Sequence, residues 1–313
     1  MFSSERLKGI DVFVCVADCG SFKAAAERMN LTGSAISKSI ARLESRLQAR
    51  LFDRTTRRLS LTEAGIAFHR TCTGVLTDLE EAELSLHAEN TEPRGRVHIG
   101  LPGAFGRLQA LPVILRFAQE HAQLLPHISF SDRFIDPIEE GVDIVVRIGG
   151  SDVWPAALGH RYLGSEWHIF CASPAYLSKQ GTPETDRDLE HHQCIAYGWG
   201  DGTVGPWRFS GACPGETERR VMPARFVVGD GEGLVIAVLA GCGIAQLPTW
   251  LIKHQLEEGS LVEVLPHLAT DGLAINLVWQ KSRQALPKVS ALLEVLAAGL
   301  TPCGGKPGSP VNS

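Results

Sequence analysis

Short hydroxyl side chains and one long cation gather near the start of a predicted helix. Ser34, Ser37 and Lys38 lie on one side of this helix, opposite its apolar residues. Hydroxyls of this length suit the edges of bases in a DNA groove, and a lysine reaches phosphates or base acceptors. These residue types at this end of a helix therefore favour contact with double-stranded DNA.

Two short amphipathic helices joined by a polar turn would position these side chains. Ser21 is a good N-cap for the first helix, Asn30 tolerates the left-handed conformation that ends it, and Thr32 can cap the second. The helical period places four apolar residues on one face of the first helix: Phe22, Ala25, Ala26 and Met29. The second helix has a predicted buried stripe of Ile36, Ile40, Leu43 and Leu47. An upstream helix would complete a three-helix core with Leu7, Ile10, Val14 and Ala17.

This pattern is typical of a helix-turn-helix, whose second helix enters the major groove of DNA, but an ordinary helical hairpin shares it. Charge favours the DNA-binding interpretation, because only two acids, Glu44 and Asp53, interrupt a basic run. The basic residues from Ser34 to Arg58 are Lys38, Arg42, Arg46, Arg50, Arg54, Arg57 and Arg58.

Two short extended arms with a basic, hydroxyl-rich tip are predicted over residues 51–62, which read LFDRTTRRLSLT. This pattern predicts a wing that lies on the phosphate backbone or reaches into the minor groove. The alternative is a solvated surface turn. The four arginines beside a helix-turn-helix (Arg50, Arg54, Arg57 and Arg58) favour the wing.

The composition is that of an ordinary globular protein of two or three domains, with 313 residues, 44% hydrophobic and 21% charged. The overall net charge of −5 conceals a basic N-terminal part: residues 1–70 hold 12 Lys and Arg against 7 Asp and Glu. A basic N-terminal part on an otherwise acidic chain is typical of a protein that binds DNA through one domain only. We expect no transmembrane helix, no signal peptide and a cytoplasmic location. The eight cysteines show no metal-ligand spacing, which indicates reduced thiols.

A long helix is predicted after the wing, from residue 62 to 89, with Thr62 as its cap. Its apolar residues are spaced 4, 3, 4, 3 and 4 apart, and they are Phe68, Cys72, Val75, Leu79, Ala82 and Leu86. This heptad seam predicts pairing with a second copy of the helix. The alternative is a helix that packs on its own domain.

Strands and helices alternate after the break at 90–95, which indicates a doubly wound α/β arrangement. Strands are predicted at 96–101, 127–130, 142–148, 167–172, 194–197, 225–228, 243–247 and 273–279. Helices are predicted at 105–120, 137–140, 174–179, 232–240 and 287–300. The helix at 105–120 would bury Leu108, Leu111, Leu115 and Ala118, and the last would bury Val289, Leu292, Leu296 and Leu300.

In this order the elements resemble the LysR-type transcriptional regulators over nearly the whole chain. The resemblance is strongest in FVCVADCGSFKAAAERMNLTGSAISKSIARLESRLQARLFDRTTRRLSLTEAG, and SDRFIDPIEEGVDIVVRIG, CASPAYL and GCGIAQLP resemble the effector-binding domain. It implies an α/β fold class with a winged helix-turn-helix (1–61), a linker and dimerisation helix (62–90) and a two-subdomain effector domain (91–300). The effector domain would resemble a periplasmic binding protein, and residues 301–313 are expected to be a disordered tail.

The resemblance also implies a sequence-specific transcriptional regulator that is controlled by a small molecule and is not an enzyme. Its partners would be a pseudo-palindromic operator, the effector, further copies in a homodimer or dimer of dimers (a homotetramer), and RNA polymerase. No catalytic residue, metal, cofactor or membrane is expected. By position, the DNA contacts are Thr32, Ser34, Ser37 and Lys38 in the helix and Arg54, Thr56, Arg57 and Arg58 in the wing.

The loop after the first effector strand departs from the family pattern. Many members carry Ser or Thr there to bind a carboxylate, whereas this chain has Leu101-Pro102-Gly103-Ala104-Phe105. Backbone N–H groups could still hold an anion. The missing hydroxyls argue against a simple carboxylate effector.

The effector cleft should lie at the carboxyl ends of strands, between the two subdomains. By position it would be lined by Pro102, Gly103, Phe105, Arg147, Tyr197, Trp199, Asp230 and Gly231. Arg147 could clamp an anion, or it could form an internal salt bridge with Asp143 or Asp230. Tyr197 and Trp199 could stack on an aromatic effector, or they could form a packed lid.

Two other classes of function remain open at this point. A thiol-switched regulator would use Cys194 and Cys213. An enzyme would use the cleft, where His191, His192 and Cys194 are close in sequence without a catalytic arrangement. The glycines at 229–233 lack the dinucleotide-binding pattern, so nucleotide binding is not predicted.

Overall fold

The computed structural model describes residues 7–55, 58–85, 92–150, 153–210 and 217–301. Within these ranges, the side chains at 54, 55, 58, 77, 78 and 80–85 fall outside the description. The chain divides into an N-terminal unit of residues 1–91, with which residues 138–141 are grouped, and a C-terminal unit of residues 92–137 and 142–313. No helix in the described ranges is long and apolar enough to cross a bilayer. Of the predicted tail at 301–313, residues 302–313 lie outside the described residues.

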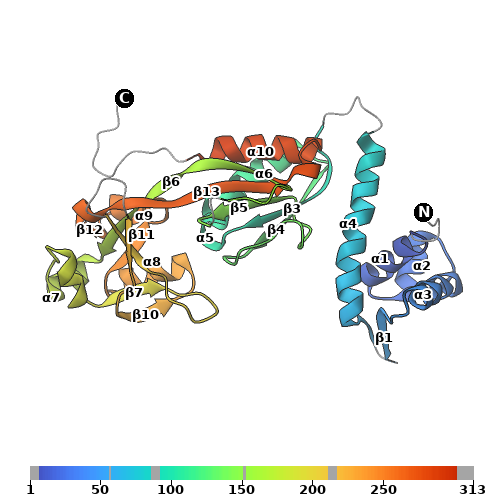
Figure 1. Ribbon diagram of the computed structural model, residues 1–313, viewed down its shortest axis with the longest axis horizontal. Helices are drawn as coiled ribbons and strands as arrows, with labels where there is room; N and C mark the ends of the chain where they lie inside the picture. Colours follow the sequence, from blue (N-terminus) through green and yellow to red (C-terminus); the bar gives the residue numbers. More distant parts are fainter. Residues whose placement is uncertain (1–6, 56–57, 86–91, 151–152, 211–216, 302–313) are drawn as a thin grey trace. The chain divides into compact units, whose positions relative to one another are not determined.

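The N-terminal unit is a three-helix bundle followed by a two-stranded ribbon and a long helix (Figure 1). The helix pair forms where the period predicted it. The Ser21 hydroxyl accepts from the Ala24 N–H at 3.1 Å, and Asn30 ends the first helix of the pair at φ 53°. Thr32 accepts from the Ala35 N–H at 3.2 Å. The elements are α1 (Ile10–Cys19), α2 (Phe22–Met29), α3 (Gly33–Leu47), β1 (Phe52–Thr55), β2 (Arg58–Leu61) and α4 (Glu63–Ser85).

The core of this unit corrects the predicted face of α1. Leu7 precedes the helix and is 53% exposed, because α1 begins only after Gly9 at φ 81°. The predicted Ile10 and Val14 are buried, and Phe13 and Val16 are fully buried as well, since α1 is covered by α2, α3 and α4 together. In α3 the predicted stripe is buried at Ile36, Ile40 and Leu43, whereas Leu47, at the end of the helix, is 37% exposed.

The C-terminal unit is built on a seven-stranded mixed sheet in the order β11-β6-β13-β5-β3-β4, with β12 beside β6. Two long antiparallel strands, β6 (Leu158–Ala172) and β13 (Thr270–Gln280), run through both halves of the unit (Figure 1). The sequence predicted only 167–172 of β6, because Gly159 to Tyr162 show no strand-like alternation of apolar residues. These two strands join two subdomains, each with its own core.

Subdomain I contains β3 (Gly95–Leu101), β4 (Leu124–Phe130) and β5 (Ile144–Ile148). One helical run covers the sheet: α5 (Gly103–Phe105), a π-helical segment (Gly106–Ala110) and α6 (Leu111–Glu120). The run buries Ala104 and Phe105 at its start and Ala110, Ile114 and Phe117 further along. The predicted stripe was therefore wrong, since Leu108 and Leu115 are about half exposed. The last helix, α10 (Pro287–Leu300), buries its four predicted residues. Residues 137–141 form a turn instead of the predicted helix.

Subdomain II carries the second α/β unit. Its strands are β7 (Cys194–Tyr197), β8 (Trp207–Ser210), β9 (Thr217–Arg220), β10 (Ala224–Val228), β11 (Ala245–Pro248) and β12 (Val262–Val264). Its helices are α7 (Pro174–Gln180), α8 (Gly231–Leu239) and α9 (Thr249–Glu257). β7 and β10 are parallel, and α8 follows β10 directly. The ends of β7 and β10 therefore point toward the same edge, where the candidate site lies.

Candidate functional site

The polar edge of α3 is presented to solvent while its opposite face is fixed in the core. Ser34 and Lys38 are exposed and one helical turn apart, Ser37 is half-buried, and Ile36 and Ile40 are fully buried. The Thr32 hydroxyl lies 3.1 Å from that of Ser34. Four predicted contact residues thus lie on or beside one exposed helix edge, which can enter a groove of DNA.

Glu44 anchors the wing to α3, a role that the sequence interpretation missed. Its carboxylate accepts from the Leu51 N–H at 2.8 Å and the Phe52 N–H at 3.2 Å. The strands β1 and β2 pair antiparallel, with Arg54 opposite Leu59 and Thr55 opposite Arg58. The two predicted arms are therefore confirmed. Thr56 and Arg57 lie outside the described residues, as do the side chains of Arg54 and Arg58.

The apolar seam of α4 divides into an inward and an outward part. Phe68 and Cys72 pack into the core of the N-terminal unit, and burial raises the pKa of Cys72 to about 11. Val75 and Leu79, further along, are 41% and 45% exposed. Packing on its own domain thus accounts for the first part of the seam only.

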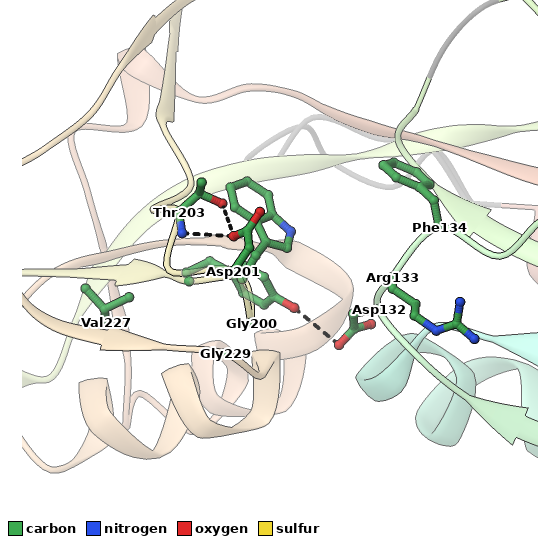
Figure 2. A pocket seen from close by; sticks show the side chains of 11 residues that line it. Asp132, Arg133, Phe134, Gly200, Asp201, Thr203, Val227 and Gly229 are labelled. Atoms are coloured by element: carbon green, nitrogen blue, oxygen red, sulfur yellow. Dashed lines mark hydrogen bonds between the residues drawn. The ribbon is translucent and has the colours of Figure 1, made fainter.

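A cavity of about 750 Å³ opens in the C-terminal unit between the two subdomains (Figure 2). One wall is the segment after β4, and the other is formed by the ends of β7 and β10 with the loop after β7. The lining residues are Asp132, Arg133, Phe134, Tyr197, Gly198, Trp199, Gly200, Asp201, Thr203, Val227 and Gly229. This position at the strand ends of an α/β unit is where ligands commonly bind.

Asp132 joins the two walls of this cavity. Its carboxylate accepts from the Gly103 N–H at 2.7 Å. It also accepts from the Tyr197 hydroxyl at 3.2 Å, the dashed line that ends at Asp132 in Figure 2. Burial and the nearby carboxylate of Asp132 raise the pKa of Tyr197 to about 12, so the phenol stays protonated and donates. The Gly103 amide, one of the backbone N–H groups that could have held an effector anion, is therefore bound to a carboxylate of the protein itself.

Two of the residues predicted for the cleft line the cavity. Tyr197 and Trp199 meet edge to face, with ring centroids 5.7 Å apart. The lining residues do not include Pro102, Gly103, Phe105, Arg147, Asp230 or Gly231. Phe105 is buried against Trp250, and Asp230 lies 3.5 Å from Arg107 of subdomain I.

Arg147 lies beside the cavity wall, between two aromatic rings. Its guanidinium carbon is 3.9 Å from the ring centroid of Phe134 and 5.2 Å from that of Trp154. The proposed salt bridges were wrong, since Asp143 pairs with Arg283 and Asp230 with Arg107. In the described part of the chain the Arg147 Nε has no hydrogen-bond partner, and burial lowers the pKa of this arginine.

Cys194 is poorly suited to a thiol switch. It is fully buried, and its thiol donates to the Leu189 carbonyl at 3.4 Å. Burial raises the pKa of Cys194 to about 11, which disfavours the reactive thiolate. Cys213, its suggested partner, lies outside the described residues.

Both parts of the chain match established families. Residues 7–66 match the bacterial regulatory helix-turn-helix proteins of the lysR family, and residues 90–301 match the LysR substrate binding domain. An uncharacterized HTH-type transcriptional regulator from Haemophilus influenzae is 33% identical, over 92% of this chain and 98% of that protein. The HTH-type transcriptional activator AaeR of Escherichia coli is 30% identical, over 93% of each chain.

Solved structures share this architecture. CrgA, a LysR-type transcriptional regulator from Neisseria meningitidis, superposes with a TM-score of 0.60 at 29% identity, over 96% of this chain and all of that one. The virulence activator AphB of Vibrio cholerae also gives a TM-score of 0.60, at 25% identity, over 94% of this chain and 99% of that one. Both the reading helix and the two-subdomain unit therefore occur together in known structures.

Proposed function

Because this chain belongs to the LysR family of DNA-binding transcriptional regulators, we propose that the exposed edge of α3 reads its operator while the cavity beside Tyr197 receives its effector. The proposed DNA contact rests on the exposed polar edge of α3. Ser34 and Lys38 are exposed on a helix whose other face, Ile36 and Ile40, is immobilised in the core. A fixed helix with free polar side chains can hold one register on DNA.

The contacts divide into two kinds. Thr32, Ser34, Ser37 and Lys38 read base edges, whereas Arg54, Thr56, Arg57 and Arg58 hold the phosphate backbone or the minor groove. The ribbon supports this division, because β1 and β2 carry Arg54 and Arg58 toward its tip.

Two copies of the chain read one operator. The outward-facing Val75 and Leu79 of α4 support pairing, and a pair would place two recognition helices on one face of DNA, about 34 Å apart or a multiple of that. Such a dimer, or a dimer of dimers, requires a pseudo-palindromic site.

Salt titration of operator binding tests the division of contacts. Arg54→Ala should weaken binding to all sequences and reduce the slope of log K against log salt by about 0.9 for each lost phosphate contact. Ser37→Ala should leave that slope unchanged and reduce the preference for the operator over unrelated DNA by about tenfold. Fluorescence anisotropy with both DNAs measures each quantity.

Matched controls are available for both variants. Ser45→Ala removes an exposed hydroxyl from the far end of α3, and Arg116→Ala removes an exposed cation from α6. Both should bind like the wild type. If Arg54→Ala and Ser37→Ala gave the same salt slope and the same loss of preference, the division would be wrong.

A further inference from the structure

The protein's own Asp132 places a negative charge at the polar end of the cavity. Asp132 binds the Gly103 N–H through one carboxylate oxygen and the Tyr197 hydroxyl through the other. These two donors are the groups that an incoming carboxylate would need. An anionic effector would therefore find both donors already bound to Asp132, and the negative charge of Asp132 would repel it.

The rest of the lining adds little positive charge. Asp201, a second carboxylate, is held by the Thr203 N–H at 2.9 Å and the Thr203 hydroxyl at 2.6 Å. Arg133 is the one cation among the described lining residues, and its side chain points away from Asp201 and Thr203 (Figure 2). The cavity therefore favours a neutral or cationic ligand.

The walls of the cavity suit a flat ring. Phe134 is 61% exposed, Val227 is 51% exposed and Trp199 is 45% exposed. Large apolar side chains that share one open cavity commonly mark a binding surface. Gly200 has no side chain, and the space beside it is open, because a Cβ placed there would meet no atom within 4 Å. An aromatic ring can lie against these side chains while its substituent faces Asp132.

We infer that the effector is a planar aromatic molecule whose polar group is a hydrogen-bond donor, either an ammonium or a neutral hydroxyl, and that Asp132 accepts from it. This inference rests on the proposed effector function of the cavity. A carboxylate offers about four acceptor positions, and the protein uses two of them. Asp132 is exposed, so the remaining positions are open to a ligand.

Three probes that share a benzene ring and differ in the charge of its substituent test the class of ligand. Benzylamine, benzyl alcohol and benzoate are titrated into the full-length protein at pH 7 by isothermal calorimetry. We expect benzylamine to bind most tightly and benzoate least, with about fivefold between the cation and the neutral probe, because the site is open to solvent. Benzoate binding at least as tightly as benzylamine, or no measurable binding of any probe, would overturn the inference.

Single substitutions test whether Asp132 causes the preference for benzylamine. Asp132→Asn keeps the size of the side chain and removes its charge, so benzylamine and benzyl alcohol should then bind equally. Asp271→Asn, which removes an exposed carboxylate from β13 outside the cavity, should keep the wild-type order. Trp199→Ala should weaken all three probes by a similar factor. An Asp132→Asn protein that keeps the full preference would contradict the assignment.

Operator binding separates this inference from the proposed function. Anisotropy without any probe reports whether the protein reads DNA, and the calorimetric order of the probes reports only the ligand class. A protein that binds its operator and prefers benzoate would retain the regulator function and refute the donor class. A protein that does not bind its operator and prefers benzylamine would refute the regulator function and retain the donor class.

Discussion

Two side chains, Asp132 and Arg147, make the contacts that shape the candidate cavity and its surroundings. Asp132 holds two donors from different subdomains, and Arg147 is stacked on Phe134 instead of paired with an acid. The sequence predicted the importance of Arg147 and Tyr197 from their positions and gave no sign of Asp132. A carboxylate in a polar loop has no periodicity that would distinguish it from a solvated one.

The buried ring of His168 makes the stability of the folded protein depend on pH. Its Nδ1 is shielded from solvent without a hydrogen-bond partner in the described residues, and burial with the nearby Arg208 lowers the pKa of His168 to about 4. Between pH 4 and 6.5 the unfolded chain therefore binds a proton that the folded chain does not. Stability is complete above pH 6.5 and falls as the pH falls, by up to about 1.4 kcal/mol per pH unit.

Urea unfolding at pH 7 and pH 5 measures this dependence. His168→Gln should lose less stability than the wild type on acidification, since it lacks the titrating ring. His191→Gln, a change at an exposed histidine, should lose as much as the wild type. Equal losses in the wild type and His168→Gln would contradict the prediction.

Among the helices, short-range signals predicted some elements and missed others: residues 137–141 form a turn, and α9 was not predicted. The bounds of α2 and α10 agree with the predicted ones, because caps and apolar spacing act within a few residues. The buried face of α6 was wrong because its leucines form an equally good stripe. The sheet selects Ile114 and Phe117, and the choice depends on how the helical run leaves β3.

Two glycines in α4 should respond in opposite ways to alanine. A Cβ at Gly65 would lie 2.1 Å from the Leu51 carbonyl oxygen, where the wing leaves α3, whereas a Cβ at Gly74 would meet nothing within 4 Å. Gly65→Ala should destabilise the protein by about 2 kcal/mol. Gly74→Ala should stabilise it by about 0.5–1 kcal/mol through helix propensity. Chemical unfolding followed by circular dichroism compares the two; stabilisation by both would exclude close packing at Gly65.

At the scale of the whole molecule, the family architecture combines a DNA reader with a two-subdomain sensor. In the proposed dimer a second copy of the reader spans the second half-site, and α4 carries apolar side chains that its own unit leaves exposed. Under this proposal, pairing through α4 is the step that brings two recognition helices to one operator.

Disrupting the outward part of the α4 seam should test that step. Leu79→Arg places a charge where an apolar contact is expected, so sedimentation velocity should show a shift toward monomer and operator affinity should fall at least tenfold. Val221→Arg makes the same kind of change at a side chain that is 68% exposed in the C-terminal unit, and it should leave the α4 pairing intact. If Leu79→Arg assembled like the wild type, α4 would serve only its own domain.

The sequence alone determined the helix pair, its caps, the two arms of the wing and the α/β alternation. Those features depend on residues within one or two turns of each other, so local patterns suffice. Only the tertiary structure decided which residues line the cavity and that Asp132 joins its two walls. The bonds of Asp132 join residues 29 and 65 positions apart through the order of strands in two subdomains. No spacing rule reports such a meeting, because it depends on how β4, α5 and β7 are brought together in space.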